Sequence, residues 1–200
     1  MTAPPPSPPA DIVRIGTFGT FYNRFDELLA DSSSLSLYFI HSRRWRENHD
    51  ASIKAFLKRG GSLEVFLPDL ENHELMFSLV RHFDDGPLIL SLVADAYRYF
   101  GRLAREFMKP TQVWLFNKYP TYSFYRFDHR AVIAMYSNTS AKKELPAFEV
   151  LTGSSLGAFL AADIEDLRKE CRRKSPVDLE GVLRNAPEAP EFLGQDHSDE

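Results

Sequence analysis

The sequence has few of the features that accompany export or thiol chemistry. It contains a single cysteine, Cys171, so an internal disulfide framework and a zinc site built from several thiolates are excluded. The N-terminus lacks a basic segment followed by an apolar stretch, and five of the first nine residues are proline. No secretory signal is therefore predicted, and the cytoplasm is the expected compartment.

Long apolar runs and phosphate-binding loops are also missing. The longest apolar stretch, residues 88–94, is interrupted by Ser91 and is far shorter than the roughly 20 residues that span a bilayer, so no membrane association is expected. No glycine-rich loop precedes a lysine, which removes support for ATP hydrolysis. The six histidines show none of the close spacings of metal motifs. We expect no metal and no cofactor.

The charge of the chain is divided unevenly. Residues 175–200 hold seven acids and one base, a net charge of −6, so residues 1–174 carry +2. The acidic pI therefore describes the C-terminal part, and a basic patch on the remainder can exist beside it. Nucleic acid or a nucleotide stays open as a partner. A hydrophobic content of 44% in 200 residues is enough for the core of one domain.

Composition and periodicity divide the chain into three parts. Residues 1–12 are interpreted as a Pro-rich disordered arm, residues 13–174 as one α/β domain, and residues 175–200 as an acidic disordered tail. Within the domain, helices are expected at 15–29, around 53–57, 74–83, 88–108 and 156–174. Strands are expected at 35–41, 63–67, 113–116, 123–127, 131–136 and 148–151. This order predicts a mixed β-sheet flanked by helices on both faces.

The most specific segment is the predicted hairpin at 121–138, whose turn holds Asp128 and whose second strand leads into Ser137 and Asn138. It resembles the active-site hairpin of the phospholipase D superfamily. In that family a strand carrying His-x-Lys precedes an Asp, and the next strand runs into a Ser and an Asn. When Asp128 is matched to the family's Asp, Thr121 stands in place of the histidine and Ser123 in place of the lysine.

The resemblance extends over about residues 35–165. It includes the strand at 35–41, the polar turn after it, Gly60-Gly61, and the strand that ends at Pro68-Asp69. It implies a single phospholipase D-like half. Because the family's enzymes use two halves, it also implies a homodimer or a catalytic partner chain.

The substitutions at Thr121 and Ser123 argue against the family's reaction. That reaction needs an imidazole nucleophile and a fixed cation, and these two hydroxyls supply neither. We therefore predict a non-catalytic binding or regulatory module whose degenerate phosphodiester or nucleotide pocket includes Thr121, Ser123, Asp128, Ser137 and Asn138. One alternative is a phosphodiesterase or nuclease with substituted residues. Another is a structural interaction domain, in which Asp128 only binds the amides of its turn.

A degenerate pocket needs cations from elsewhere, and two groups are candidates. The segment after the strand at 35–41 holds Arg43, Arg44, Trp45, Arg46 and Asn48, at the carboxyl edge where open α/β sheets bind ligands. There Trp45 would offer a stacking surface. The second group, Arg98, Arg102, Arg105 and Lys109, forms a stripe on the helix at 88–108. The alternative for both groups is ordinary solvated charge.

A competing motif lies at residues 153–157, which fit Gly-x-Ser-x-Gly between a strand and a helix. Ser155 would be the nucleophile of an acyl transfer. The motif equally fits a helix start in which a serine caps free amides and a glycine allows close packing. Only His197 follows Ser155 as a partner histidine, which favours the cap.

Overall fold

The computed structural model describes residues 11–83, 86–107, 111–137 and 144–186. They form an eight-stranded mixed sheet with the strand order β1-β7-β6-β5-β2-β3-β4-β8. The strands are β1 (Ile12–Thr17), β2 (Ser34–Tyr38), β3 (Ser62–Pro68), β4 (Thr111–Phe116), β5 (Tyr122–Phe127), β6 (Arg130–Met135), β7 (Pro146–Leu151) and β8 (Arg172–Lys174).

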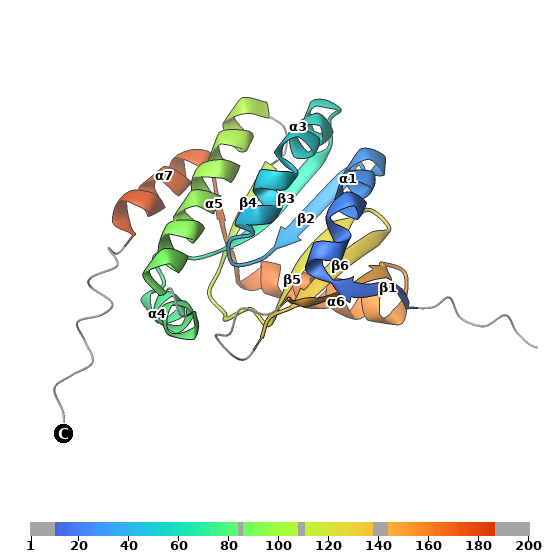
Figure 1. Ribbon diagram of the computed structural model, residues 1–200. Helices are drawn as coiled ribbons and strands as arrows, with labels where there is room; N and C mark the ends of the chain where they lie inside the picture. The colour runs from blue at the N-terminus through green and yellow to red at the C-terminus, as the bar shows by residue number, and fades with distance from the viewer. Residues whose placement is uncertain (1–10, 84–85, 108–110, 138–143, 187–200) are drawn as a thin grey trace, which may run out of the picture.

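Helices cover both faces of this sheet, as Figure 1 shows. They are η1 (Phe18–Phe21), α1 (Tyr22–Asp31), α2 (Arg43–Asn48), α3 (Asp50–Lys58), α4 (His73–His82), α5 (Gly86–Phe107), α6 (Ser155–Glu170) and α7 (Pro176–Asn185). In the view of Figure 1, α1, α3 and α5 lie in front of the sheet, α7 lies beside α5, and α6 crosses behind. The predicted mixed sheet with helices on both faces is confirmed.

The pairing of the central strands determines which ends of the strands lie together at the candidate site. β2 pairs in parallel with β3, and β3 with β4, so the carboxyl ends of all three lie at one edge of the sheet. β5 runs antiparallel to β2, with Tyr38 opposite Phe124 and Leu35 opposite Phe127. The beginning of β5 therefore meets the end of β2. This side of the sheet is called the carboxyl edge below.

An aromatic core fills the space between the sheet and the helices on both of its faces. Its largest fully buried side chains are Phe21, Phe25, Phe39, Trp45, Phe56, Phe66, Tyr97, Phe100, Phe116, Phe124, Tyr125 and Phe127. Buried aromatic rings contribute most of the apolar area in such a core. Tight packing also fixes the turn after α3: Gly60 has a positive φ of 93°, and a Cβ on Gly61 would lie 2.4 Å from the Phe56 ring. The left-handed conformation at Gly60 and the close approach of the Phe56 ring at Gly61 therefore both require glycine.

No helix in the described part of the chain is long and apolar enough to cross a membrane.

Both ends of the predicted domain need correction. Residues 12–17 form strand β1, where the sequence predicted the end of the arm and the start of a helix; α1 begins only at Tyr22. The predicted acidic tail is helical in its first part, because Ser175 and Asp178 form a capping box for α7. Leu179 and Val182 are buried there. Residues 187–200 and most of the Pro-rich arm lie outside the described residues.

Candidate functional site

Ser123, in the position that the resemblance gives to a lysine, is only 4% exposed. It shares a face of the sheet with Tyr125, whose ring packs against Phe25 of α1 and Trp45 of α2. The Ser123 hydroxyl donates to the Ala134 carbonyl at 3.4 Å and interacts with the hydroxyls of Tyr125 and Tyr136. The Tyr125 hydroxyl is in turn hydrogen-bonded to Ser42. These four side chains form a neutral hydroxyl cluster beneath the carboxyl edge.

The hydroxyl cluster also supports the backbone that follows β2. The Tyr136 hydroxyl accepts a hydrogen bond from the amide of Ile40 at 3.1 Å. Burial raises the pKa of both tyrosines, so both stay neutral at physiological pH. No charged side chain takes part in the cluster within the described ranges, so neutral groups surround the position that the resemblance gives to a lysine.

Thr121, in the position of the family's histidine, lies just before β5 and is exposed. Its carbonyl accepts from the Tyr136 amide at 3.0 Å, and its hydroxyl makes no hydrogen bond to any residue that the structure describes. His129, the histidine nearest in sequence, lies in the β5–β6 turn at the far end of the hairpin. Among the described residues, no general base contacts the Thr121 hydroxyl to activate it as a nucleophile.

Asp128 also lies in that far turn, with a positive φ of 37°. Its carboxylate accepts hydrogen bonds from the amides of Ser33 at 2.8 Å and Ser34 at 2.9 Å, and from both hydroxyls. Partial burial opposes ionisation, but these bonds, with Ser34 first, hold the pKa of Asp128 below its usual value. Across β5 the distance to Thr121 is about 20 Å by the rise of a strand. The structure therefore does not bring Asp128 to the other predicted site residues.

Of the two predicted site residues after β6, Ser137 lies within the described residues and Asn138 does not. Ser137 follows β6 at the carboxyl edge, on the same side of the sheet as Thr121. Asn138 lies outside the described residues.

The basic segment after β2 forms the short helix α2, and its side chains separate into two kinds. Trp45 is buried and packs against the rings of Phe25, His49 and Tyr125, so it offers no stacking surface to a ligand. Arg46 is 5% exposed; its Nε donates to the His41 carbonyl at 2.9 Å, and its guanidinium lies over the Tyr99 ring. The predicted ligand-binding role is contradicted for these two side chains, because both anchor α2 from inside.

Arg43, Arg44 and Asn48 occupy the outer side of α2 and are exposed. Arg43 pairs with Glu47 at 2.8 Å, whereas Arg44 has no ion-pair partner among the described residues. These three side chains remain available to a ligand at the carboxyl edge.

Sequence reasoning gave little weight to His41, which the structure places at the start of this segment. Its Nδ1 accepts a hydrogen bond from the Arg43 amide at 3.1 Å, so a neutral ring carries its proton on Nε2. Burial, and then the charges of Arg46 and Arg43, lower the pKa of His41 to about 4. His41 is therefore a neutral donor. Its position directly after a buried strand and before three arginines in four residues was the signal available in the sequence.

The second group of predicted cations lies beside α2. Arg98 pairs with Asp95 at 2.8 Å, and the Asp95 charge also acts on Arg43, so α5 and α2 present their arginines side by side. Farther along α5, a shallow cavity of about 230 Å³ opens between α5 and α7. It is lined by Tyr97, Arg98, Gly101, Arg102, Arg105, Leu179, Glu180 and Leu183. Arg105 pairs with Glu180, and Arg102 has no ion-pair partner within the described part of the chain. Lys109 lies outside the described residues.

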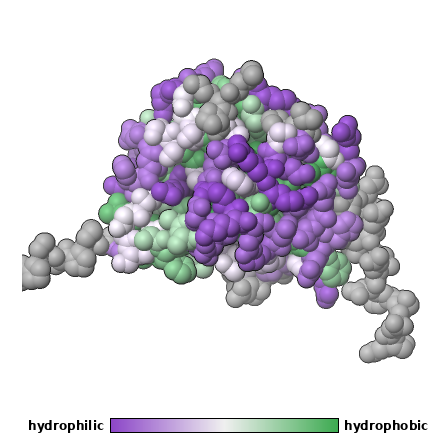
Figure 2. All heavy atoms as spheres, turned by 180° about the vertical axis from the view of Figure 1, so that it is seen from behind, coloured by the Kyte–Doolittle hydropathy of each residue, from purple (hydrophilic) through white to green (hydrophobic). Residues whose placement is uncertain are grey.

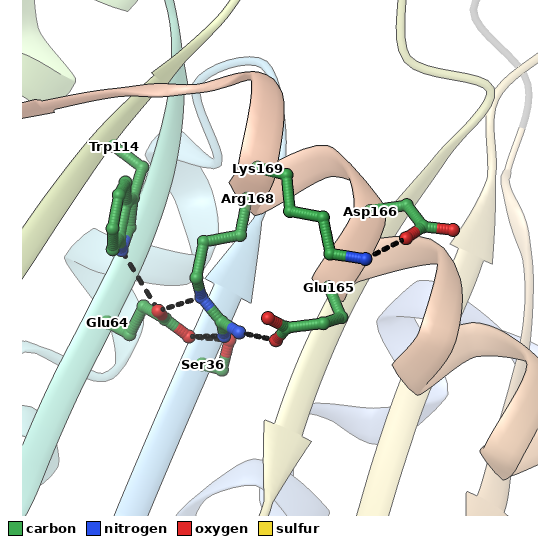
Figure 3. Close-up of polar contacts among 7 residues, drawn as sticks. All are labelled: Ser36, Glu64, Trp114, Glu165, Asp166, Arg168 and Lys169. Atoms are coloured by element: carbon green, nitrogen blue, oxygen red, sulfur yellow. Dashed lines mark hydrogen bonds and ion pairs between the residues drawn. The ribbon is translucent and has the colours of Figure 1, made fainter.

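A second hollow lies on the opposite face of the sheet, which is largely hydrophilic in Figure 2. It measures about 300 Å³ and is lined by Ser34, Leu35, Ser36, Ser62, Leu63, Glu64, Gln112 and Arg126. At its border, Figure 3 shows Arg168 of α6 reaching the carboxylate of Glu64 through two hydrogen bonds of 2.8 Å. Ser36 and the Trp114 indole donate to the same carboxylate. Four hydrogen bonds satisfy Glu64, which marks it as the anchor of α6 on the sheet.

The Gly-x-Ser-x-Gly motif is a helix start in the structure. Ser154 is the N-cap of α6 and its hydroxyl accepts from the Gly157 amide at 3.1 Å. A Cβ on Gly157 would lie 2.2 Å from the Leu151 carbonyl oxygen, so only glycine allows this close approach. The alternative in which serine caps the helix and glycine permits close packing is confirmed.

Comparison with known proteins gives likeness in structure only. No protein-family model and no curated protein matches the sequence. The archaeal chromatin protein TrmBL2, described as showing a novel mode of DNA binding, superposes with a TM-score of 0.51 and 10% identity, over 82% of this chain and 55% of that one. Phosphatidylserine synthase from Haemophilus influenzae Rd KW20 gives 0.55 and 12%, over 84% of this chain and 41% of that one. This chain thus spans about half or less of either protein.

A phospholipase D family member, Nuc from Salmonella typhimurium, is also found, with 9% identity over 81% of this chain and 97% of that one. Its TM-score of 0.46 is too low to carry an argument. At 10% and 12% identity, the other two likenesses concern the fold and leave activity open. They agree with the predicted mixed α/β fold and show no finer assignment.

Proposed function

We propose that this chain is a non-catalytic phospholipase D-like module that binds the phosphodiester backbone of a nucleic acid. The observation that carries the proposal is the burial of Ser123 within the neutral hydroxyl cluster. A merely inactivated site would leave an empty, solvated space where a cation had stood. Here tyrosine hydroxyls fill this space, and Tyr136 also accepts a hydrogen bond from the Ile40 amide. These contacts support a structural role for the position and argue against phosphoryl transfer.

The available cations support binding to an extended anion. Arg43 and Arg44 lie on the outer side of α2, and Arg98 and Arg102 continue from them along α5. On a helix, residues four and three apart share one side, and Arg98 to Arg105 spans about 10 Å along the axis. A backbone with phosphates several ångströms apart can contact such a row, whereas a single phosphate uses only one part of it. The description of TrmBL2 as a DNA-binding protein agrees with this class of ligand.

Two of these arginines contribute most to the expected affinity. Arg43 and Arg98 already face carboxylates, but Arg44 and Arg102 have no ion pair with a described residue. Each phosphate contact lowers the slope of log K against log salt by about 0.9 for duplex DNA. Two free arginines therefore predict a slope of about −2.

The test is a fluorescence-anisotropy titration of labelled single- and double-stranded oligonucleotides at several salt concentrations. We expect salt-dependent binding, and a slope that becomes shallower by about 1 in Arg44→Ala or Arg102→Ala. Lys58→Ala is the matched control, because Lys58 is exposed at the end of α3, away from the carboxyl edge, and its loss should leave the slope unchanged. Absence of binding, or equal effects of all three variants, would overturn the proposal.

A further inference from the structure

The carboxyl edge of the sheet carries an exposed aromatic ring. Tyr119 lies between β4 and β5, in the segment that leads to Thr121, and is 36% exposed. The ring of His82, from the end of α4, contacts the Tyr119 ring in a T-shaped arrangement, with 5.4 Å between the centroids and an interplanar angle of 63°. Two segments that are far apart in the sequence thus position one aromatic side chain at the surface.

The Tyr119 side chain has contact area that the fold does not use. A T-shaped contact occupies at most one face of a ring, so the contact with His82 leaves part of the Tyr119 ring open to solvent. The Tyr119 hydroxyl makes no hydrogen bond to any residue that the structure describes. Burial raises the pKa of Tyr119 to about 12, so the phenol is neutral at physiological pH and does not repel an anion.

The position of Tyr119 connects it to the arginines of α2. Its phenol lies near enough to the Tyr136 phenol that a charge on one raises the pKa of the other. The Tyr136 hydroxyl accepts a hydrogen bond from the Ile40 amide, two residues before Ser42, which is the N-cap of α2. The exposed ring therefore lies beside the segment that leads into α2 and its unpaired Arg44.

We propose that Tyr119 is a stacking platform for one unpaired base, so that the chain prefers single-stranded to double-stranded nucleic acid. This inference rests on the proposed function, because the arginines supply the contacts to the backbone. Single-strand-binding proteins combine such cations with aromatic rings on which bases stack. The bases of a duplex are stacked on their neighbours, so a duplex would use the arginines alone. A protein partner would need a broader apolar patch, whereas a base needs one ring.

Fluorescence anisotropy of the full chain with labelled probes of equal length tests the stacking. The probes are a single strand of thymidines, the same strand with an abasic site at every position, and a duplex. We expect the wild type to bind the thymidine strand at least about fivefold more tightly than the abasic strand. Tyr119→Leu keeps an apolar side chain without the ring and should abolish this difference. The slope of log K against log salt should stay unchanged in this variant, because no charge is lost.

Two further variants separate stacking from other effects of the substitution, and circular dichroism confirms that each variant is folded. Tyr119→Trp retains a ring and should keep the preference for the thymidine strand. Phe159→Leu is the matched control: the Phe159 ring is 66% exposed, but it lies on α6 behind the sheet, and its loss should change nothing.

The outcomes distinguish failure of the stacking from failure of the proposed function. Equal affinity of the wild type for the thymidine and abasic strands would overturn the stacking and leave binding to the backbone in place. A preference that survives in Tyr119→Leu would overturn the role of Tyr119. Absence of binding to all three probes would overturn the proposed function and this inference with it.

Discussion

Introducing a lysine at Ser123 is the sharpest test of the neutral hydroxyl cluster. Ser123 is 4% exposed and its neighbours are the phenols of Tyr125 and Tyr136. An ammonium group there loses its hydration without gaining a carboxylate, so the lysine should titrate far below its usual pKa of about 10.4. With a pKa near 6 in the folded state, Ser123→Lys costs about 4 to 5 kcal/mol at pH 7, and the extra volume adds about 1 to 3 kcal/mol.

The sign of the pH dependence separates charge from volume. Between the folded and unfolded pKa values the unfolded chain binds one more proton, so the stability of Ser123→Lys rises with pH. Its free energy of unfolding should recover by about 2 to 3 kcal/mol between pH 7 and pH 9. Ser123→Met has a similar length without the charge, and its deficit should stay constant over the same range.

Urea denaturation followed by the fluorescence of the buried Trp45 measures these differences. Thr121→Lys serves as the surface control and should change stability by no more than about 0.5 kcal/mol, because Thr121 is exposed. A Ser123→Lys variant that is as stable as the wild type, with no dependence of its stability on pH, would contradict this expectation. Position 123 would then be open to solvent, and the cluster would not exclude a cation.

Three further substitutions test other parts of the structure. Glu64→Gln should cost about 1.5 to 3 kcal/mol by weakening the charged hydrogen bonds to Arg168, whereas Glu165→Gln, an exposed partner of the same arginine, should cost under about 0.5 kcal/mol in urea denaturation. Asp128→Asn should lower stability at pH 7 by about 1 kcal/mol. Because the folded pKa of Asp128 is depressed, the difference from wild type should begin to shrink near the ordinary value of 3.8 and be lost as the pH falls through the lower folded pKa. Gly157→Ala should lower the melting temperature, since its Cβ meets the Leu151 carbonyl, whereas Gly153→Ala meets no atom within 4 Å and should be tolerated; equal effects would contradict the packing described.

The spacing of apolar residues along the sequence predicted most of the helices and strands, because this spacing reflects which side of each element is buried. All six predicted strands are present within a few residues, and α4 and α5 follow the predicted helices closely. The errors occur where local signals compete with tertiary contacts. β1 is exposed over most of its length, so its Ile12–Thr17 segment shows no clear alternation, and the nearby aromatic residues continue a helical pattern. α7 looks like an acidic tail until Leu179 and Val182 are seen to be buried.

The candidate site was less predictable, because side-chain burial cannot be judged from residue type alone. Arg46 is charged, yet it is buried beneath α2, whereas the neighbouring Arg44 is exposed. The side of a helix that faces the core shows in a sequence as apolar residues that recur every three to four positions. The six residues of α2 are too few to reveal this period. The hydroxyl cluster unites Ser42, Ser123 and Tyr136 from three segments, and only the sheet register brings them together.

We propose that this chain binds phosphodiester backbone and does not cleave it. The most direct measurement is incubation of labelled oligonucleotide at protein concentrations that saturate the anisotropy signal, followed by a denaturing gel of the same samples. We expect fully bound and fully intact oligonucleotide, with and without added divalent metal. Shortened products that disappear in Thr121→Ala would contradict it, because they would show that the exposed hydroxyl at the carboxyl edge still acts as a nucleophile.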